Sequence, residues 1–250
     1  MNSYLTTHLN QTADTLPWPC SPVFFINSHL FHHLDSYIVS PSFHRCPSLV
    51  FSADLAIPAL LVAVLAYLAG SVSAAILVCR AMGLQDPRTA GSGNPGATNV
   101  LRVGGKLPAI LTLLGDALKG FLPVFITASL IDHPATIALT ALAAFIGHLY
   151  PIFFNFEGGK GVATALGALL GIDLTVGALA LLTWLAISLT FKRSSLAALV
   201  TFALVPVYLS FEGHQTFAVG FTMIGAFLYY THRGNIQRLI AGTEPVIGKR

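Results

Sequence analysis

Long apolar runs separated by short polar segments dominate the chain from Ala53 onward. A helix needs about 20 apolar residues to cross the hydrocarbon core of a bilayer. The apolar sequence from 162 to 191 is too long for one crossing, and Gly171-Ile172-Asp173 interrupts it, so we divide it in two. The pattern therefore predicts seven membrane-spanning helices, at 55–79, 107–130, 135–154, 162–172, 174–191, 196–210 and 215–231.

The helix predicted at 162–172 is too short to cross the membrane by itself. At 1.5 Å per residue it reaches only about 17 Å, whereas the hydrocarbon core is about 30 Å thick. We expect it to lie inside the bundle or to begin below the membrane interface. A five-helix alternative joins 162–191 and 195–231 into single helices, but it moves Lys192 and Arg193 to the outside.

Basic residues gather at one end of the predicted helices, which indicates an orientation because Lys and Arg favour the cytoplasmic side. With the N-terminus outside, seven crossings leave Asp132, Asp173 and Glu212 outside, and Arg45 is the only Arg or Lys there. The cations placed at the cytoplasmic face are Arg80, Arg88, Arg102, Lys106, Lys160, Lys192, Arg193, Arg233, Arg238, Lys249 and Arg250.

Composition agrees with a membrane protein, because 54% of the residues are hydrophobic and only 9% are charged, against about 25% charged in soluble domains. The net charge of +3 and the lack of a basic stripe with aromatics argue against a nucleic-acid partner. The three cysteines match no metal or redox spacing, so we expect no metal site. We interpret residues 1–52, which are polar and lack a signal-peptide pattern, as a poorly ordered N-terminal extension that leaves the translation start open. Residues 53–250 form the polytopic membrane domain.

The first of three polar cytoplasmic segments is Gly91-Ser-Gly-Asn-Pro-Gly-Ala-Thr-Asn-Val-Leu-Arg102. Its glycines let the backbone adopt positive φ and approach a ligand closely, and Asn94-Pro95-Gly96 is typical of a turn. Arg102 adds a planar cation suited to phosphate. A flexible connection would explain the glycines but not so many polar donors, so we interpret the segment as a phosphate-binding loop.

The second segment ends in Gly158-Gly159-Lys160-Gly161, directly before an apolar helix. Free backbone N–H groups at a helix start bind anions, and glycines give a phosphate room to enter. The segment is not a Walker A loop, because Phe154 stands where the first glycine belongs and Gly161 replaces the Ser or Thr. A flexible hinge beside an interfacial lysine is the alternative. His148 lies in the apolar helix before this loop, and intramembrane ionisable groups are functional candidates.

The third segment, from His232 to Glu244, follows the last predicted span. His232, Asn235 and Arg238 are spaced three apart and share one face if the segment is helical. We interpret Arg233 as a positive-inside anchor. Within the second span, Asp116 and Lys119 have the i, i+3 spacing of an ion pair; a structural pair is our first interpretation and a substrate role for Lys119 our second.

These segments resemble the three signature loops of the bacterial acyl-phosphate:glycerol-3-phosphate acyltransferases, the PlsY family. The resemblance rests on Ser92-Gly-Asn-Pro-Gly-Ala-Thr-Asn-Val-Leu-Arg102, on Gly147-His148 with Gly-Gly-Lys-Gly161-Val-Ala-Thr164, and on His232-Arg-Gly-Asn-Ile-Gln-Arg-Leu with Gly-Thr-Glu244. It covers about residues 55–248, and the N-terminal extension is where the chain departs from the family. It implies an all-α, seven-helix enzyme of the inner membrane with cytoplasmic glycine-rich active-site loops.

The resemblance also implies a reaction and a site. An acyl group would pass from acyl phosphate to the 1-hydroxyl of glycerol 3-phosphate, giving lysophosphatidic acid and phosphate, without cofactor or metal. The implied partners are both substrates, membrane lipids and the enzyme that makes acyl phosphate. The implied catalytic residues are Lys160, His232 and Asn235. The implied substrate-binding residues are Ser92, Gly93, Asn94, Gly96, Thr98, Asn99, Arg102, His148, Gly158, Gly159, Gly161 and Arg238.

Acyl phosphate is already activated, so positioning and charge stabilisation matter more than a covalent nucleophile. We expect direct attack by the hydroxyl, with the departing phosphate taking the proton; His148 or His232 as general base is the rival. The other class of function is a transporter of a phosphorylated small molecule. The sequence shows no internal repeat, and the polar motifs gather on one face, which argues against a transporter. No histidine has Asp five positions on, as soluble-type glycerolipid acyltransferases require.

Overall fold

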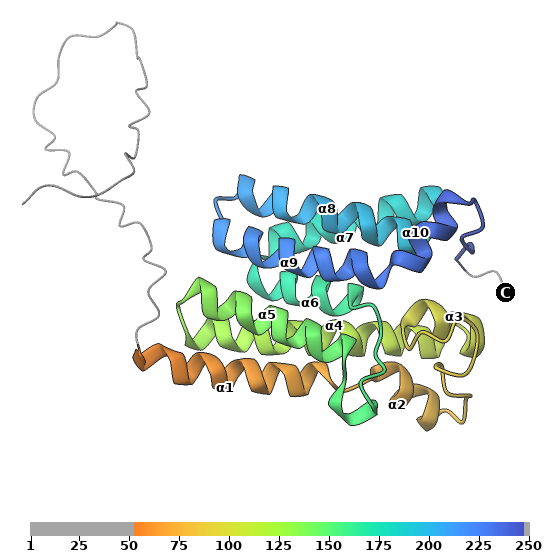
Figure 1. The fold of residues 1–250 in the computed structure, drawn as a ribbon, viewed down its shortest axis with the longest axis horizontal. Helices are drawn as coiled ribbons and strands as arrows, with labels where there is room; N and C mark the ends of the chain where they lie inside the picture. The colour runs from red at the N-terminus through yellow and green to blue at the C-terminus, as the bar shows by residue number, and fades with distance from the viewer. Residues whose placement is uncertain (1–52, 248–250) are drawn as a thin grey trace, which may run out of the picture. The chain divides into compact units, whose positions relative to one another are not determined.

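The computed structural model describes residues 53–247, and every regular element among them is a helix (Figure 1). The prediction of an all-α protein is therefore confirmed, while the predicted extension at 1–52 lies outside the described residues. The elements are α1 (Ala53–Gly70), α2 (Ala74–Ala81), α3 (Ala97–Gly104), α4 (Lys106–Leu130), α5 (Pro134–Leu149), the 3-10 turn η1 (Ile152–Phe154), α6 (Val162–Ile172), α7 (Leu174–Phe191), α8 (Ser194–Phe211), α9 (Gln215–Thr231) and α10 (Arg233–Ile240).

Five helical stretches within residues 53–247 are long and apolar enough to cross a membrane, and α6 is a shorter apolar helix. The five are Leu55–Ala81, Lys106–Leu130, Pro134–Phe154, Leu174–Phe191 and Ser194–Phe211. Every predicted span contains a helix, and the number of crossings stays a prediction. α6 is buried over most of its length, which confirms that this short helix lies inside the bundle.

Two predicted spans agree with the apolar stretches but are not continuous helices, and the first glycine-rich segment is more helical than expected. The single helix expected at 55–79 is broken after Gly70, and the carbonyl of Val72 in the break accepts a hydrogen bond from Lys119 Nζ at 2.7 Å. The helix expected at 135–154 ends at Leu149, because Tyr150 precedes a proline and is pushed out of the α region. The first glycine-rich segment is half helical, since no helix breaker stands between Ala97 and Val103.

Glycines let the helices approach at backbone distance, as is common where small residues line membrane helix interfaces. A Cβ added at Gly120 of α4 would overlap the Thr164 carbonyl of α6, and one at Gly167 would overlap the Ala117 carbonyl. Gly171 faces the backbone of Phe121, so α6 runs parallel to α4 and begins roughly two helical turns after α4 does.

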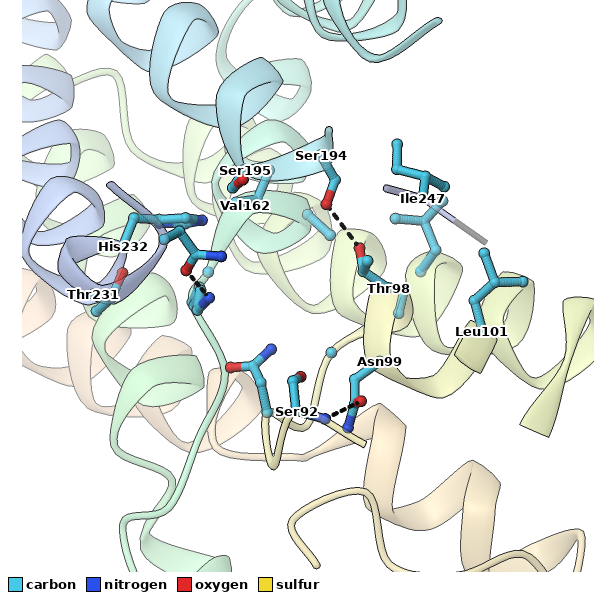
Figure 2. A pocket seen from close by; sticks show the side chains of 18 of the residues that line it. Ser92, Thr98, Asn99, Leu101, Val162, Ser194, Ser195, Thr231, His232 and Ile247 are labelled. Carbon is cyan, nitrogen blue, oxygen red and sulfur yellow. Dashed lines mark hydrogen bonds between the residues drawn. The ribbon is translucent and has the colours of Figure 1, made fainter. Parts of the chain in front are cut away.

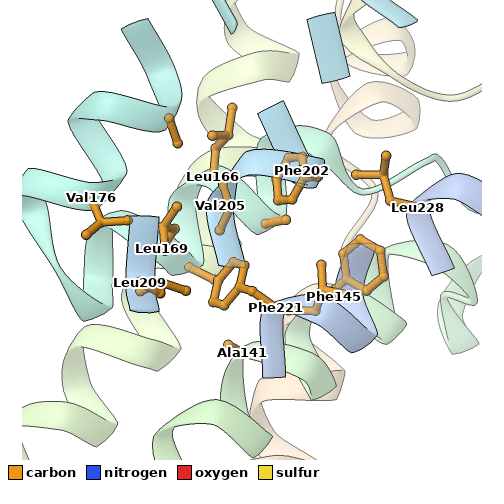
Figure 3. Packing of buried hydrophobic residues seen from close by; sticks show 14 of the residues in the cluster. Ala141, Phe145, Leu166, Leu169, Val176, Phe202, Val205, Leu209, Phe221 and Leu228 are labelled. Carbon is orange, nitrogen blue, oxygen red and sulfur yellow. The ribbon is translucent and has the colours of Figure 1, made fainter. Parts of the chain in front are cut away.

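A buried apolar core joins α5 and α6 to α8 and α9 (Figure 3). Phe145, Leu169, Phe202 and Phe221 are its largest members, and each is at most 2% exposed. Many large apolar side chains on α1, α4 and α7 are instead exposed, with values up to 78% at Leu130. Exposed apolar surface on this scale marks a membrane contact. The core therefore keeps the ends of α5, α6, α8 and α9 in place, and the polar segments extend from these ends.

The close α4–α6 contact predicts a sharp cost for Gly167→Ala. The new methyl would overlap the Ala117 carbonyl, so the two helices must separate, with a loss of about 1–3 kcal/mol in the free energy of unfolding. The control is Gly220→Ala in α9, whose Cβ would have its nearest neighbour at 3.3 Å. Thermal unfolding in detergent should show a lower transition for Gly167→Ala only; equal transitions would contradict this packing.

Candidate active site

A cavity of about 980 Å³ takes in side chains from all three polar segments. Its walls come from α3, the start of α4, the loop before α6, the start of α8, and α10 (Figure 2). The predicted site residues that line it are Ser92, Gly93, Asn94, Gly96, Thr98, Asn99, Arg102, His148, Lys160, Gly161, His232, Asn235 and Arg238. Gly158 and Gly159 do not line the cavity, although they belong to the loop that carries Lys160.

Asn99 shapes the first glycine-rich segment from within. Its Nδ2 donates to the carbonyls of Pro87 (2.8 Å) and Ala90 (2.9 Å), and its Oδ1 accepts from Ser92 N–H (2.8 Å; Figure 2). The side chain is only 1% exposed. Both amide N–H donors are thus engaged by the loop itself, so Asn99 holds the conformation in which Ser92 faces the cavity.

Arg102 follows Thr98 by about one turn on α3, and both residues line the cavity. Arg102 Nε is buried and has no hydrogen-bond partner within the described chain. Thr98 Oγ1 donates to Ser194 Oγ at 3.3 Å, which links α3 to the start of α8 (Figure 2). The guanidinium therefore offers a donor that is already removed from water, a favourable arrangement for a phosphate oxygen.

The second segment ends where α6 begins. Gly161 caps α6 with a φ of 85°, and a Cβ there would overlap the Phe145 ring, so only glycine suits the position. Lys160 Nζ donates to Asn235 Oδ1, which brings the second and third segments together. Burial lowers the pKa of Lys160 to about 8; Glu244 opposes this shift, and the charges of Arg238 and Arg102 add to it.

The third segment is helical from Arg233 to Ile240, which is the condition under which His232, Asn235 and Arg238 share one face. α10 starts directly after His232, and His232, Asn235 and Arg238 all line the cavity. His232 Nδ1 lies 2.8 Å from the Leu228 carbonyl and so carries the proton in the neutral ring, leaving Nε2 as an acceptor. Burial lowers the pKa of His232 to about 4, and the charge of Lys160 adds to the shift. The imidazole is therefore neutral at pH 7.

Glu244 joins these elements, and sequence reasoning placed it in the motif without giving it a role. Its buried carboxylate accepts from Ser195 Oγ (2.6 Å), Asn235 Nδ2 (2.6 Å) and Arg238 Nε (2.8 Å). Burial alone would raise the pKa of Glu244, but these three hydrogen bonds bring it below its ordinary value. A lone carboxylate among so many cations was the signal that could have identified Glu244; nothing in the sequence indicated Ser195.

Cations outnumber carboxylates around the cavity. Arg102, Lys106, Lys160, Arg233 and Arg238 line it, against Asp116 and Glu244. Both carboxylates are paired, Asp116 with Lys119 at 2.8 Å and Glu244 with Arg238, and the first of these confirms the predicted ion pair. The site therefore suits anions. Among residues 53–247, no three His, Cys, Asp or Glu side chains cluster as a metal site would require.

Several known proteins that are similar to this chain have the same name. The sequence model of the family described as "Glycerol-3-phosphate acyltransferase" matches residues 60–242. A protein of that name from Thioalkalivibrio sulfidiphilus is 54% identical over 186 residues, covering 74% of this chain and 92% of the relative. One from Bordetella pertussis is 49% identical over 212 residues, covering 82% and 95%.

Two crystal structures have a similar fold. Both are of PlsY (YgiH), described as an integral membrane glycerol 3-phosphate acyltransferase. The glycerol 3-phosphate form is 39% identical with a TM-score of 0.73, covering 76% of this chain and 96% of that chain. The lysophosphatidic acid form is 38% identical with a TM-score of 0.71, covering 76% and 95%.

The hydrogen bonds of Asn99 predict that Asn99→Ala loosens the first segment. The Pro87 carbonyl and the Ser92 N–H lose their partner, and the Ala90 carbonyl keeps only its bond from Gly93 N–H, at a cost of about 1–3 kcal/mol for each buried group that is left unpaired. Hydrogen exchange across residues 86–93 should become faster in detergent. Asn94→Ala is the control, because Asn94 makes no side-chain hydrogen bond within residues 53–247; similar exchange in both variants would contradict the assigned role.

Proposed function

This chain belongs to the glycerol-3-phosphate acyltransferase family, and we propose that it takes its acyl group from acyl phosphate. It is a multi-pass membrane enzyme that acylates glycerol 3-phosphate. The acceptor in our proposal is the 1-hydroxyl, and the products are lysophosphatidic acid and inorganic phosphate. The reaction is the first acylation of phospholipid synthesis.

The convergence of three anion-binding segments on one cavity carries this proposal. Ser92, Arg102, Lys160, His232 and Asn235 hold the glycerol phosphate, and the first glycine-rich segment surrounds the acyl-phosphate head group. The cavity also has an apolar part, which suits a fatty chain. That part is lined by Ile110, Leu113, Leu166, Leu181 and Trp184.

The residues at hand favour direct attack. The hydroxyl oxygen bonds to the acyl carbon, the bond from that carbon to the phosphate oxygen breaks, and the departing phosphate takes the hydroxyl proton. The departing inorganic phosphate is a stronger base than His232, whose pKa burial lowers to about 4. Lys160 and Arg102 stabilise the charge that develops. The buried Cys79 packs with Val100 and Ala109 in a small apolar cluster that is distinct from the main core.

We place the site on the cytoplasmic side of the inner membrane, where the enzyme that produces acyl phosphate can deliver it. The positive-inside distribution of Lys and Arg supports this side. Residues 53–250 form the catalytic domain in this proposal and 1–52 an extension. A transporter of phosphorylated molecules suits the fold less well, since the polar segments meet in a single cavity.

The donor predicts a simple assay. Purified protein in detergent receives glycerol 3-phosphate with palmitoyl phosphate or, separately, with palmitoyl-CoA. We expect phosphate release and lysophosphatidic acid only with palmitoyl phosphate, and turnover with palmitoyl-CoA alone would overturn the proposed donor. Lys160→Ala and Arg102→Ala should each lower kcat/KM at least about 100-fold, because each removes a charged hydrogen bond from a buried phosphate. Near-native rates in both variants would refute the assigned phosphate site.

The lowered pKa of Lys160 predicts a pH effect on glycerol 3-phosphate binding. Its ammonium form persists below pH 7 and is lost as the pH rises through about 8, so the KM for glycerol 3-phosphate should rise above that pH. Lys160→Arg keeps its charge at every accessible pH, and its KM should stay flat from pH 7 to 9.5. Parallel alkaline profiles in the two proteins would show that another group titrates.

A further inference from the structure

A buried polar cluster in the wall of the cavity joins α4 to the end of α5. Asp116 and Lys119 come from α4, and His148 comes from the last turn of α5. Asp116 Oδ1 lies 2.8 Å from Lys119 Nζ and 3.6 Å from His148 Nδ1. Lys119 also donates to the Val72 carbonyl in the break between α1 and α2. The cluster therefore fixes α4, the α1–α2 break and the end of α5 to one another.

His148 supports the second segment with both its ring and its backbone. Its Nδ1 edge faces Asp116, and its other edge faces Gly159, where an added Cβ would overlap Nε2 and Cε1. The His148 carbonyl accepts a hydrogen bond from Gly159 N–H at 3.2 Å. The Pro95 carbonyl of the first glycine-rich segment would lie 3.2 Å from the same Cβ. Gly159 thus lies close to both the His148 ring and the first glycine-rich segment.

We propose that Asp116 and His148 are positioning residues that set the place of Gly158–Gly161, and through it of Lys160. The His148 ring is the support on which Gly159 rests, and the Asp116 carboxylate favours the orientation in which Nδ1 of that ring faces it across 3.6 Å. Lys160 is the next residue, and its Nζ reaches Asn235. A loop that drifts from this support withdraws Lys160 from the bound phosphate. This inference rests on the proposed function.

The fit of the ring against Gly159 predicts rescue by a size exchange. Gly159→Ala introduces a methyl where the ring lies, so the loop must move and the KM for glycerol 3-phosphate should rise about tenfold or more. In a His148→Ala background the same methyl has room, so Gly159→Ala should cost less than about threefold. Such a double-mutant cycle isolates the contact between the two positions. If His148 were instead the general base, His148→Ala alone would remove most of kcat.

Gly158→Ala is the matched control. Its Cβ would overlap the backbone carbonyls of His148 and Leu149, which His148→Ala leaves in place, so no rescue is expected. Asp116→Asn keeps the size of the side chain but weakens its hold on the ring. We expect its KM for glycerol 3-phosphate to rise severalfold while kcat changes less than about twofold.

The measurements are phosphate release against glycerol 3-phosphate concentration, thermal unfolding in detergent, and hydrogen exchange across residues 157–162. An equal penalty for Gly159→Ala in both backgrounds would falsify the proposal, as would an Asp116→Asn variant that loses kcat and thermal stability with KM unchanged. Hydrogen exchange needs no turnover: Gly159→Ala should speed exchange in the loop of the wild-type background, and it should add little further exchange in the His148→Ala background, where the overlap with the ring is absent. If the wild-type protein releases no phosphate, the proposed reaction is wrong. The hydrogen-exchange pattern would still test the positioning role.

Discussion

The carboxylate of Glu244 holds together parts of the chain that are far apart in sequence. It accepts hydrogen bonds from Ser195 at the start of α8 and from Asn235 and Arg238 on α10. Asn235 in turn accepts from Lys160. One buried negative charge thus lets two cations, Lys160 and Arg238, stand close together without a ligand. Removing a partner from such a network leaves the remaining buried groups uncompensated, which is costly.

The glycines around the site and its charged groups both affect how Lys160 and His232 are charged. Gly161 brings the chain against the Phe145 ring at the start of α6, and the neighbouring Lys160 is largely buried. Loss of water lowers the pKa of Lys160, and in our proposal the substrate phosphate is the partner for its charge. Burial keeps His232 neutral for the same reason. The site is therefore set up for an anion before the anion arrives, which is the basis of electrostatic catalysis.

Sequence reasoning found the helices, the three segments and the shared face of α10, because each depends on residues close together in the chain. The end of α5 at Leu149 was also readable, since Pro151 marks it. The break after Gly70 could not be predicted in this way, because Lys119, which donates to the Val72 carbonyl in the break, lies 47 positions away from it. The inward role of Asn99 and the links from Glu244 to Ser195 and Asn235 likewise depend on how distant segments fold together.

The segment after α10 also bears on how the protein is made. Arg193 Nε donates to the Glu244 carbonyl (3.3 Å), and Ile247 N–H donates to the Lys192 carbonyl (2.8 Å), so this segment is tied to the turn between α7 and α8. The ribosome supplies Glu244 only after every helix described here. A nascent chain with all its helices inserted still lacks the carboxylate that joins α8 to α10. A chain that ended at Ile240 would therefore keep the described helices but lose the carboxylate that binds Ser195, Asn235 and Arg238.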